Sequence, residues 1–191
     1  MTEEKVQLHR GLREVYIDRS KSSFIDGNIG KLLYRGYNID DLAVHSNFEE
    51  TAYLVMYGKL PTQAQLDEFD AKLKAARLIP DEIVDIIKLT RNSHPMDVLR
   101  TAISALSAYD PDTEDNSTEA TLRKGLRLTA QAPTIVATHA RVRDGKDPIA
   151  PDSNLNQAAN FLNMLFGELP EKVDSDLIDK DFVLHAEHGI N

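Results

Sequence analysis

The sequence contains no cysteine, and it has no apolar run that approaches the roughly 18–20 residues needed to cross a bilayer. The first absence excludes disulfides, thiolate metal sites and a cysteine nucleophile. The second predicts a protein without a membrane partner. The polar, acidic start of the chain, MTEEK, is not typical of a secretory signal peptide, so we expect a cytoplasmic protein.

Basic residues are also in the minority. The chain has 22 Lys and Arg against 31 Asp and Glu, which gives a net charge of −9. A nucleic-acid-binding protein would normally carry a basic patch, so this balance argues against a nucleic-acid partner. With 41% hydrophobic and 28% charged residues, the 191-residue chain has the composition of a folded globular protein of one large domain or two small ones.

A short β region is predicted near the N-terminus. Residues 15–17 (VYI) are β-prone, and the turn signal at residues 26–28 (DGN) precedes a second β-prone segment at 29–37. A turn signal between such segments indicates a hairpin of two or three short strands. We therefore expect residues 1–38 to form an N-terminal arm with short strands.

The remaining residues, 39–191, show the apolar spacing of helices. Asn47 is a typical helix cap, Glu50 stands where it would complete a capping box, and Gly58 is a typical helix end. The fold class predicted from this pattern is mainly all-α, with a small β element at the N-terminus. Further helices are expected to begin at Pro61–Thr62, with Gln65 as the capping-box partner, at Pro80–Asp81 and at Ser93–Pro95. A long helix is expected after an acidic loop at 110–120 and should reach about Arg143. Two more helices are expected near 154–167 and 174–187.

Two histidines near the end of the sequence, His185 and His188, are the first candidates for chemistry. Their i, i+3 spacing would place them on one face of a helix. Three interpretations stay open. They could be metal ligands, although no third ligand follows at motif spacing. They could be a structural pair at a helix end, where imidazolium suits the helix dipole. They could also form a polar site for an anionic small molecule, with His as donor or acid–base group.

His94 is a further candidate, either for catalysis or as a helix cap. Pro95 follows it, and proline suits the first turn of a helix because its missing N–H would have no partner there. We therefore favour the cap.

Four segments of the sequence carry a resemblance to a known family. In order and spacing over residues 11–191 they resemble the N-terminal half of the citrate synthases, a family that includes the 2-methylcitrate synthases. The segments are YRGYNIDDLA (34–43), FEETAYL (48–54) with GKLPT (58–62), SHPMDVLRT (93–101) and LHAEHGIN (184–191).

The resemblance implies a citrate synthase-like multihelical fold and a homodimer, in which residues 1–191 form the N-terminal part of the large domain. It implies the condensation of acetyl-CoA with oxaloacetate to citrate and free CoA in the tricarboxylic acid cycle, or the use of propionyl-CoA by a 2-methylcitrate synthase. No cofactor and no metal are implied, since acetyl-CoA is a substrate. In the family an Asp removes the methyl proton, one His stabilises the enol and a second His polarises the oxaloacetate carbonyl.

Position by position, the resemblance assigns substrate-binding roles to three residues. His188 matches the oxaloacetate-binding histidine, Asn191 matches the Asn near the substrate, and His185 matches a supporting position. Gly189 departs from the family's usual Glu. The catalytic Asp and His and the oxaloacetate-clamping arginines are expected beyond Asn191, together with the small domain, so the 191 residues alone are expected to be inactive.

A non-catalytic alternative remains. A helical chain of this kind could act in dimer assembly, because its apolar helix stripes are suited to association with a partner.

Overall fold

The structure is a computed structural model that describes Gly11, Val15 and residues 20–189. Val15 has no regular secondary structure, and its β-prone neighbours Tyr16 and Ile17 lie outside the described residues. Within the described part of the chain, no helix combines the length and the apolar character that a bilayer crossing needs.

The predicted hairpin is present as a small antiparallel sheet. Its strands are β1 (Ser23–Asp26), β2 (Lys31–Tyr34) and β3 (Tyr37–Asn38), in the order β1-β2-β3. Asp26 holds the first turn, because its Oδ1 accepts a hydrogen bond from Asn28 N at 3.0 Å. The prediction of short strands in the N-terminal arm is confirmed.

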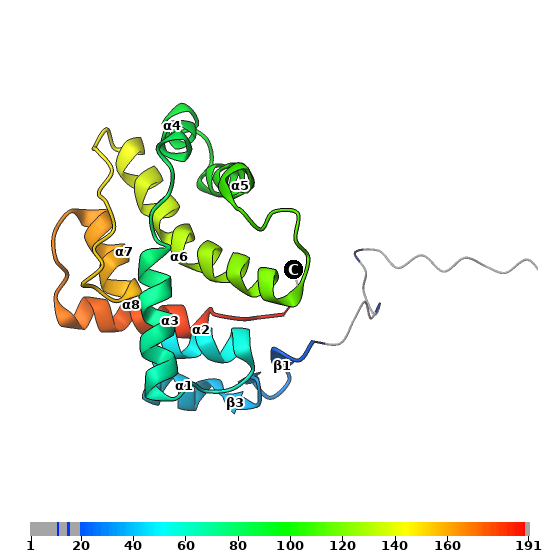
Figure 1. Cartoon of the computed structure of the whole chain (residues 1–191). Coiled ribbons are helices and arrows are strands. Elements are labelled where there is room, and N and C mark those ends of the chain that lie inside the picture. Colours follow the sequence, from blue (N-terminus) through cyan, green and yellow to red (C-terminus); the bar gives the residue numbers. More distant parts are fainter. Residues whose placement is uncertain (1–10, 12–14, 16–19, 190–191) are drawn as a thin grey trace, which may run out of the picture.

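Helices make up most of the remaining described chain, as the sequence predicts (Figure 1). A 3-10 turn, η2 (Ser107–Tyr109), follows the fifth helix. The helices are α1 (Ile39–His45), α2 (Phe48–Tyr57), α3 (Gln63–Ala75), α4 (Asp81–Leu89), α5 (Pro95–Leu106), α6 (Thr118–Arg143), α7 (Gln157–Phe166) and α8 (Lys172–Leu184).

The predicted helix caps are largely confirmed. The side chain of Asn47 accepts from Glu50 N at 2.9 Å, and Gly58 ends α2 in the left-handed region with φ 81°. The capping box predicted for α2 is wrong in its second half, because the Glu50 carboxylate accepts the Ser46 hydroxyl at 2.7 Å instead. The Thr62–Gln65 box of α3 is complete.

His94 is a helix cap, as favoured above. Its Nδ1 accepts a hydrogen bond from Met96 N at 3.2 Å, and Pro95 occupies the first helical position of α5. The backbone amides at this helix start have few other acceptors, so the imidazole is used structurally.

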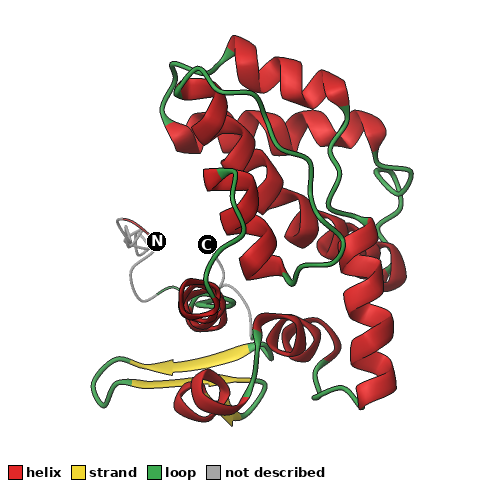
Figure 2. Cartoon of the chain, turned by 90° about the vertical axis from the view of Figure 1, so that its left-hand side faces the viewer, coloured by secondary structure: helices red, strands yellow, loops and turns green. Residues whose placement is uncertain are grey.

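Helix α6 is the centre of the packing. It contacts α3, α4, α5 and α7, with α4 and α5 at one end of the molecule and the small sheet at the opposite end in both views (Figures 1 and 2). One apolar cluster joins α2, α3 and α6, and a second joins α4, α5 and α6. The third cluster joins β2, α1, α2 and α8 through Tyr34, Ile39, Leu42, Leu54 and Val183, and so fixes the end of α8 that carries the candidate histidines.

Candidate functional site

The candidate histidines lie where α8 ends. Leu184 is the last helical residue, and His185 caps the helix through its backbone N–H. Residues 186–189 leave the helix, so the prediction of a helix over 174–187 with His185 and His188 on one face is wrong. In a longer helix the Leu184 carbonyl would accept the His188 amide; in the structure it accepts the Tyr34 hydroxyl at 2.9 Å.

His185 has a structural environment. Its side chain is 75% exposed, and Nδ1 lies 2.8 Å from the Asp181 carbonyl oxygen and 3.3 Å from Asp181 Oδ1. The same carbonyl also accepts the His185 backbone N–H at 3.1 Å, so backbone and imidazole of His185 both bind the last turn of α8. The supporting role assigned to His185 by resemblance stays a prediction.

His188 has a different environment. It is exposed, and its ring makes no hydrogen bond to any other described residue. An imidazole held in an irregular turn and open to solvent can donate to, or accept from, a small molecule. Asn191, the third predicted substrate residue, lies outside the described residues.

The N-terminal arm holds this turn, which sequence reasoning missed. Besides the Tyr34 contact, Ser22 Oγ donates to Glu187 Oε1 at 3.0 Å, and Gly189 N donates to the same oxygen at 3.1 Å. Burial raises the pKa of the buried Tyr34 phenol, the Glu187 carboxylate raises it further, and a hydrogen bond from the Glu187 backbone lowers it. In each of the missed pairs, Tyr34 with Leu184 and Ser22 with Glu187, the two residues are more than 140 positions apart in the sequence. Only the YRGY segment of the family resemblance indicated that this part of the arm matters.

The described residues contain no cluster of three or more His, Cys, Asp or Glu side chains arranged to hold a metal ion. The metal interpretation of His185 and His188 therefore has no further ligand among them.

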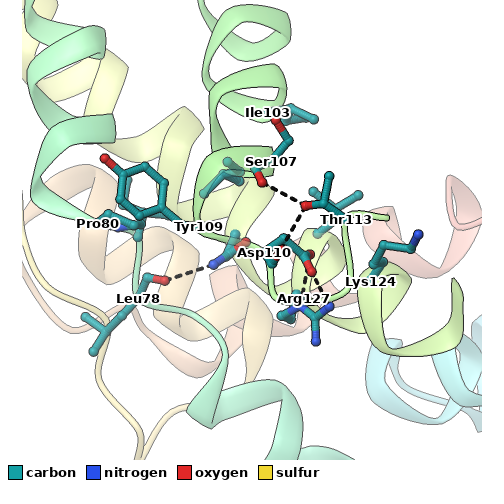
Figure 3. Close-up of a pocket in the computed structure, with 13 residues that line it drawn as sticks. Leu78, Pro80, Ile103, Ser107, Tyr109, Asp110, Thr113, Lys124 and Arg127 are labelled. Atoms are coloured by element: carbon teal, nitrogen blue, oxygen red, sulfur yellow. Dashed lines mark hydrogen bonds and ion pairs between the residues drawn. The ribbon is translucent and has the colours of Figure 1, made fainter. Parts of the chain in front are cut away.

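A separate apolar pocket of about 560 Å³ lies between the α3–α4 loop, the end of α5 and α6 (Figure 3). Both of its cations are already engaged. Lys124 Nζ donates to the Asp115 carbonyl at 2.6 Å. Arg127 Nε and Nη2 bind both carboxylate oxygens of Asp110, and Nη2 also binds Asp112. Arg123 binds Asp112 as well, and the two guanidinium groups hold the pKa of that carboxyl well below its usual range. These contacts anchor the acidic loop to α6 rather than leaving an arginine free for an anionic ligand.

Comparison with known proteins identifies the family. The family described as "Citrate synthase, C-terminal domain" matches residues 11–191. A citrate synthase of Haloferax volcanii is 46% identical over 190 residues, which cover 97% of this chain and 50% of that protein. A 2-methylcitrate synthase of Mycobacterium tuberculosis is 42% identical over 190 residues, covering 99% of this chain and 48% of that protein.

A solved structure agrees in fold. The citrate synthase of Thermoplasma acidophilum, described as a ternary complex with carboxymethyl coenzyme A and oxaloacetate, superposes with a TM-score of 0.91 at 25% identity, over 97% of this chain and 49% of that one. The chain thus spans about half the length of the relatives it matches. On the matched residues and the shared fold, the chain belongs to the citrate synthase family.

Proposed function

We propose that this chain supplies part of the substrate site of a citrate synthase-type acyltransferase, which condenses acetyl-CoA with oxaloacetate to citrate and free CoA. The observation that carries the proposal is the exposed imidazole of His188, which has no hydrogen-bond partner among the described residues and stands in the turn after α8, within the segment that resembles the family's substrate motif. The Thermoplasma acidophilum relative, whose description names oxaloacetate and a coenzyme A derivative, supports these substrate classes.

The chemistry assigns His188 a donor's role. Attack of an enol on the oxaloacetate carbonyl places negative charge on the carbonyl oxygen, and a positioned N–H stabilises that charge most where water is excluded. His188 would polarise this carbonyl. The base that removes the methyl proton and the His that stabilises the enol belong, by resemblance, to segments outside these 191 residues, and no metal or prosthetic group is required.

Propionyl-CoA is the second candidate acyl donor. The 42% identity to a 2-methylcitrate synthase lies close to the 46% identity to a citrate synthase. Sequence identity over the matched residues therefore does not distinguish the two activities. Relative kcat/KM values for acetyl-CoA and propionyl-CoA distinguish the two activities directly.

We propose a homodimer in the cytoplasm for the whole protein, with residues 1–191 in its large domain. The exposed apolar side chains Leu89 and Met96, at the α4 end and the α5 start, support association. A helical chain that acts only in assembly is the alternative, and it would bind a partner without forming citrate.

The test begins with the polypeptide isolated from its source. Its intact mass shows whether the 21.4 kDa of these residues is the whole protein or part of a longer one. Release of free thiol from acetyl-CoA in the presence of oxaloacetate then measures activity. If a polypeptide longer than these residues binds oxaloacetate but releases no thiol from either thioester, the proposed function is wrong.

The His188→Ala substitution tests the residue that carries the proposal. Removal of a donor to a developing oxyanion should lower kcat/KM for oxaloacetate by about 100-fold or more. His45→Ala is the control, because His45 is also exposed but lies at the end of α1, outside the segment that resembles the substrate motif. Equal activity of the two variants would exclude His188 from the site.

A further inference from the structure

The turn that carries His188 is held on both sides by the N-terminal arm. Before His188, the Leu184 carbonyl accepts the Tyr34 hydroxyl at 2.9 Å. After it, Gly189 N donates to Glu187 Oε1 at 3.1 Å, and Ser22 Oγ donates to the same oxygen at 3.0 Å. The five residues that make these contacts, Ser22, Tyr34, Leu184, Glu187 and Gly189, are called the clasp below.

Tyr34 is well placed to hold the end of α8 in position. Its side chain is 0% exposed and packs with Ile39, Leu54 and Val183, so the ring has little freedom to move. The hydroxyl at the end of this fixed ring reaches the last carbonyl of α8. A rigid apolar body with one polar end is suited to fixing the position of a backbone group.

Glu187 connects the arm to the residue that follows His188. Its Oε1 accepts from Ser22 and from Gly189, while its Oε2 is buried without a partner among the described residues. Ser22 directly precedes β1, and its carbonyl accepts at 2.8 Å from the backbone N–H of Arg35, the residue after β2. The carboxylate is thus held by a residue next to the sheet, and it holds the turn in which Gly189 has φ 90°.

We propose that Tyr34 is a positioning residue for His188, and that the clasp sets the conformation in which this imidazole meets oxaloacetate. The role deepens the function proposed above and rests on it, because it concerns the same histidine. Tyr34 does not touch the substrate in this proposal. It acts by fixing the backbone at the end of α8, from which the turn with His188 continues.

The first test is Tyr34→Phe in the intact enzyme, which keeps the buried ring and removes only the hydroxyl. Loss of one neutral hydrogen bond that orients the turn should raise the KM for oxaloacetate about three- to tenfold. The KM for acetyl-CoA and the melting temperature should stay close to the wild-type values. Tyr37→Phe is the matched control, because Tyr37 lies on β3 beside Tyr34 and is partly exposed.

The Glu187 substitutions test the other side of the clasp. Glu187→Gln keeps an oxygen that can accept from Ser22 and Gly189, whereas Glu187→Ala removes it. We expect the alanine variant to raise the KM for oxaloacetate and the glutamine variant to restore a value near wild type. Equal oxaloacetate KM values for Glu187→Gln and Glu187→Ala would overturn the proposed clasp.

A measurement that needs no activity separates the clasp from the proposed function. In protein labelled with ¹⁵N-histidine, the ring signals of His188 should move on Tyr34→Phe and stay in place on Tyr37→Phe. If the wild-type enzyme is inactive but these signals move, the clasp stands and the proposed function fails. If the signals stay in place, or if both KM values and the melting temperature change together, Tyr34 has only a packing role and the proposal is wrong.

Discussion

Glu49 is a carboxylate that caps a helix other than its own. It belongs to α2 and is 5% exposed, and its Oε1 accepts from Gln157 N, the first residue of α7, at 2.8 Å. Burial raises its pKa, and the nearby carboxylates of Asp179 and Asp70 raise it further. The buried guanidinium of Arg77 is a cation near Glu49, and it binds Gln157 Oε1 at 2.8 Å. The ionised carboxylate is therefore a destabilising charge that also supplies a necessary acceptor.

Substitution of Glu49 separates the charge from the acceptor. Because its pKa is raised, the folded state binds the proton more tightly than the unfolded state, and stability falls as pH rises from about 4.5 through the raised pKa. Glu49→Gln keeps an acceptor and should lose this pH dependence, so its stability relative to wild type should increase over that interval. Glu49→Ala should cost about 1–3 kcal/mol, because Gln157 N loses its partner.

Urea unfolding of the purified protein between pH 4.5 and 8 measures both effects. Glu171→Gln is the control, because Glu171 is exposed and its side chain makes no capping hydrogen bond. Parallel pH curves for wild type and Glu49→Gln would contradict the expected role of the charge.

At the scale of helices and strands, local sequence signals predicted where helices begin better than where they end. The α2, α3 and α5 starts were predicted because Asn47, Thr62 and His94 bond to amides two or three residues away. The end of α8 was not predicted, because its last carbonyl binds Tyr34, 150 residues earlier in the chain. His188 was found by its motif, but its conformation depends on that distant contact, which no periodicity can reveal.

Long-range capping also joins α8 to α2. Asp179 of α8 is buried, and its Oδ1 accepts from Phe48 N, the first residue of α2, at 3.0 Å. The Phe48 ring packs edge-on against Phe182 with a centroid distance of 5.3 Å. The helix that precedes the His188 turn is thus attached to α2 by both a hydrogen bond and an aromatic contact.

Loss of the Asp179 carboxylate should weaken this attachment. Asp179→Ala is expected to lower the free energy of unfolding by about 1–3 kcal/mol, because the Phe48 amide is left without an acceptor. Asp179→Asn keeps an oxygen and should cost less. Asp176→Ala, at an exposed position on the same helix, is the control for urea unfolding. Similar losses for Asp179→Ala and Asp176→Ala would mean that the contact with α2 adds no stability.

On the scale of the whole molecule, the described residues form a folded core with much apolar surface left open. Leu89 is 84% exposed and Leu169 is 69% exposed, and other large apolar side chains are open on α5, α7 and α8. Apolar side chains left open in this way are the surface on which the proposed association with a partner rests. The chain spans about half the length of the relatives it matches.

Condensation needs more catalytic groups than these 191 residues are expected to supply. Residues 1–191 produced as an isolated chain should release no thiol from acetyl-CoA in the presence of oxaloacetate. In the proposed function His188 supplies a donor for one substrate, but condensation also needs a base for the methyl proton and a donor for the enol, and both must be positioned together. By resemblance, these groups belong to other segments of the family's sequence. The intact polypeptide from the source, assayed at the same molar concentration, is the control. Citrate formation by the isolated chain would place the complete catalytic set within these residues.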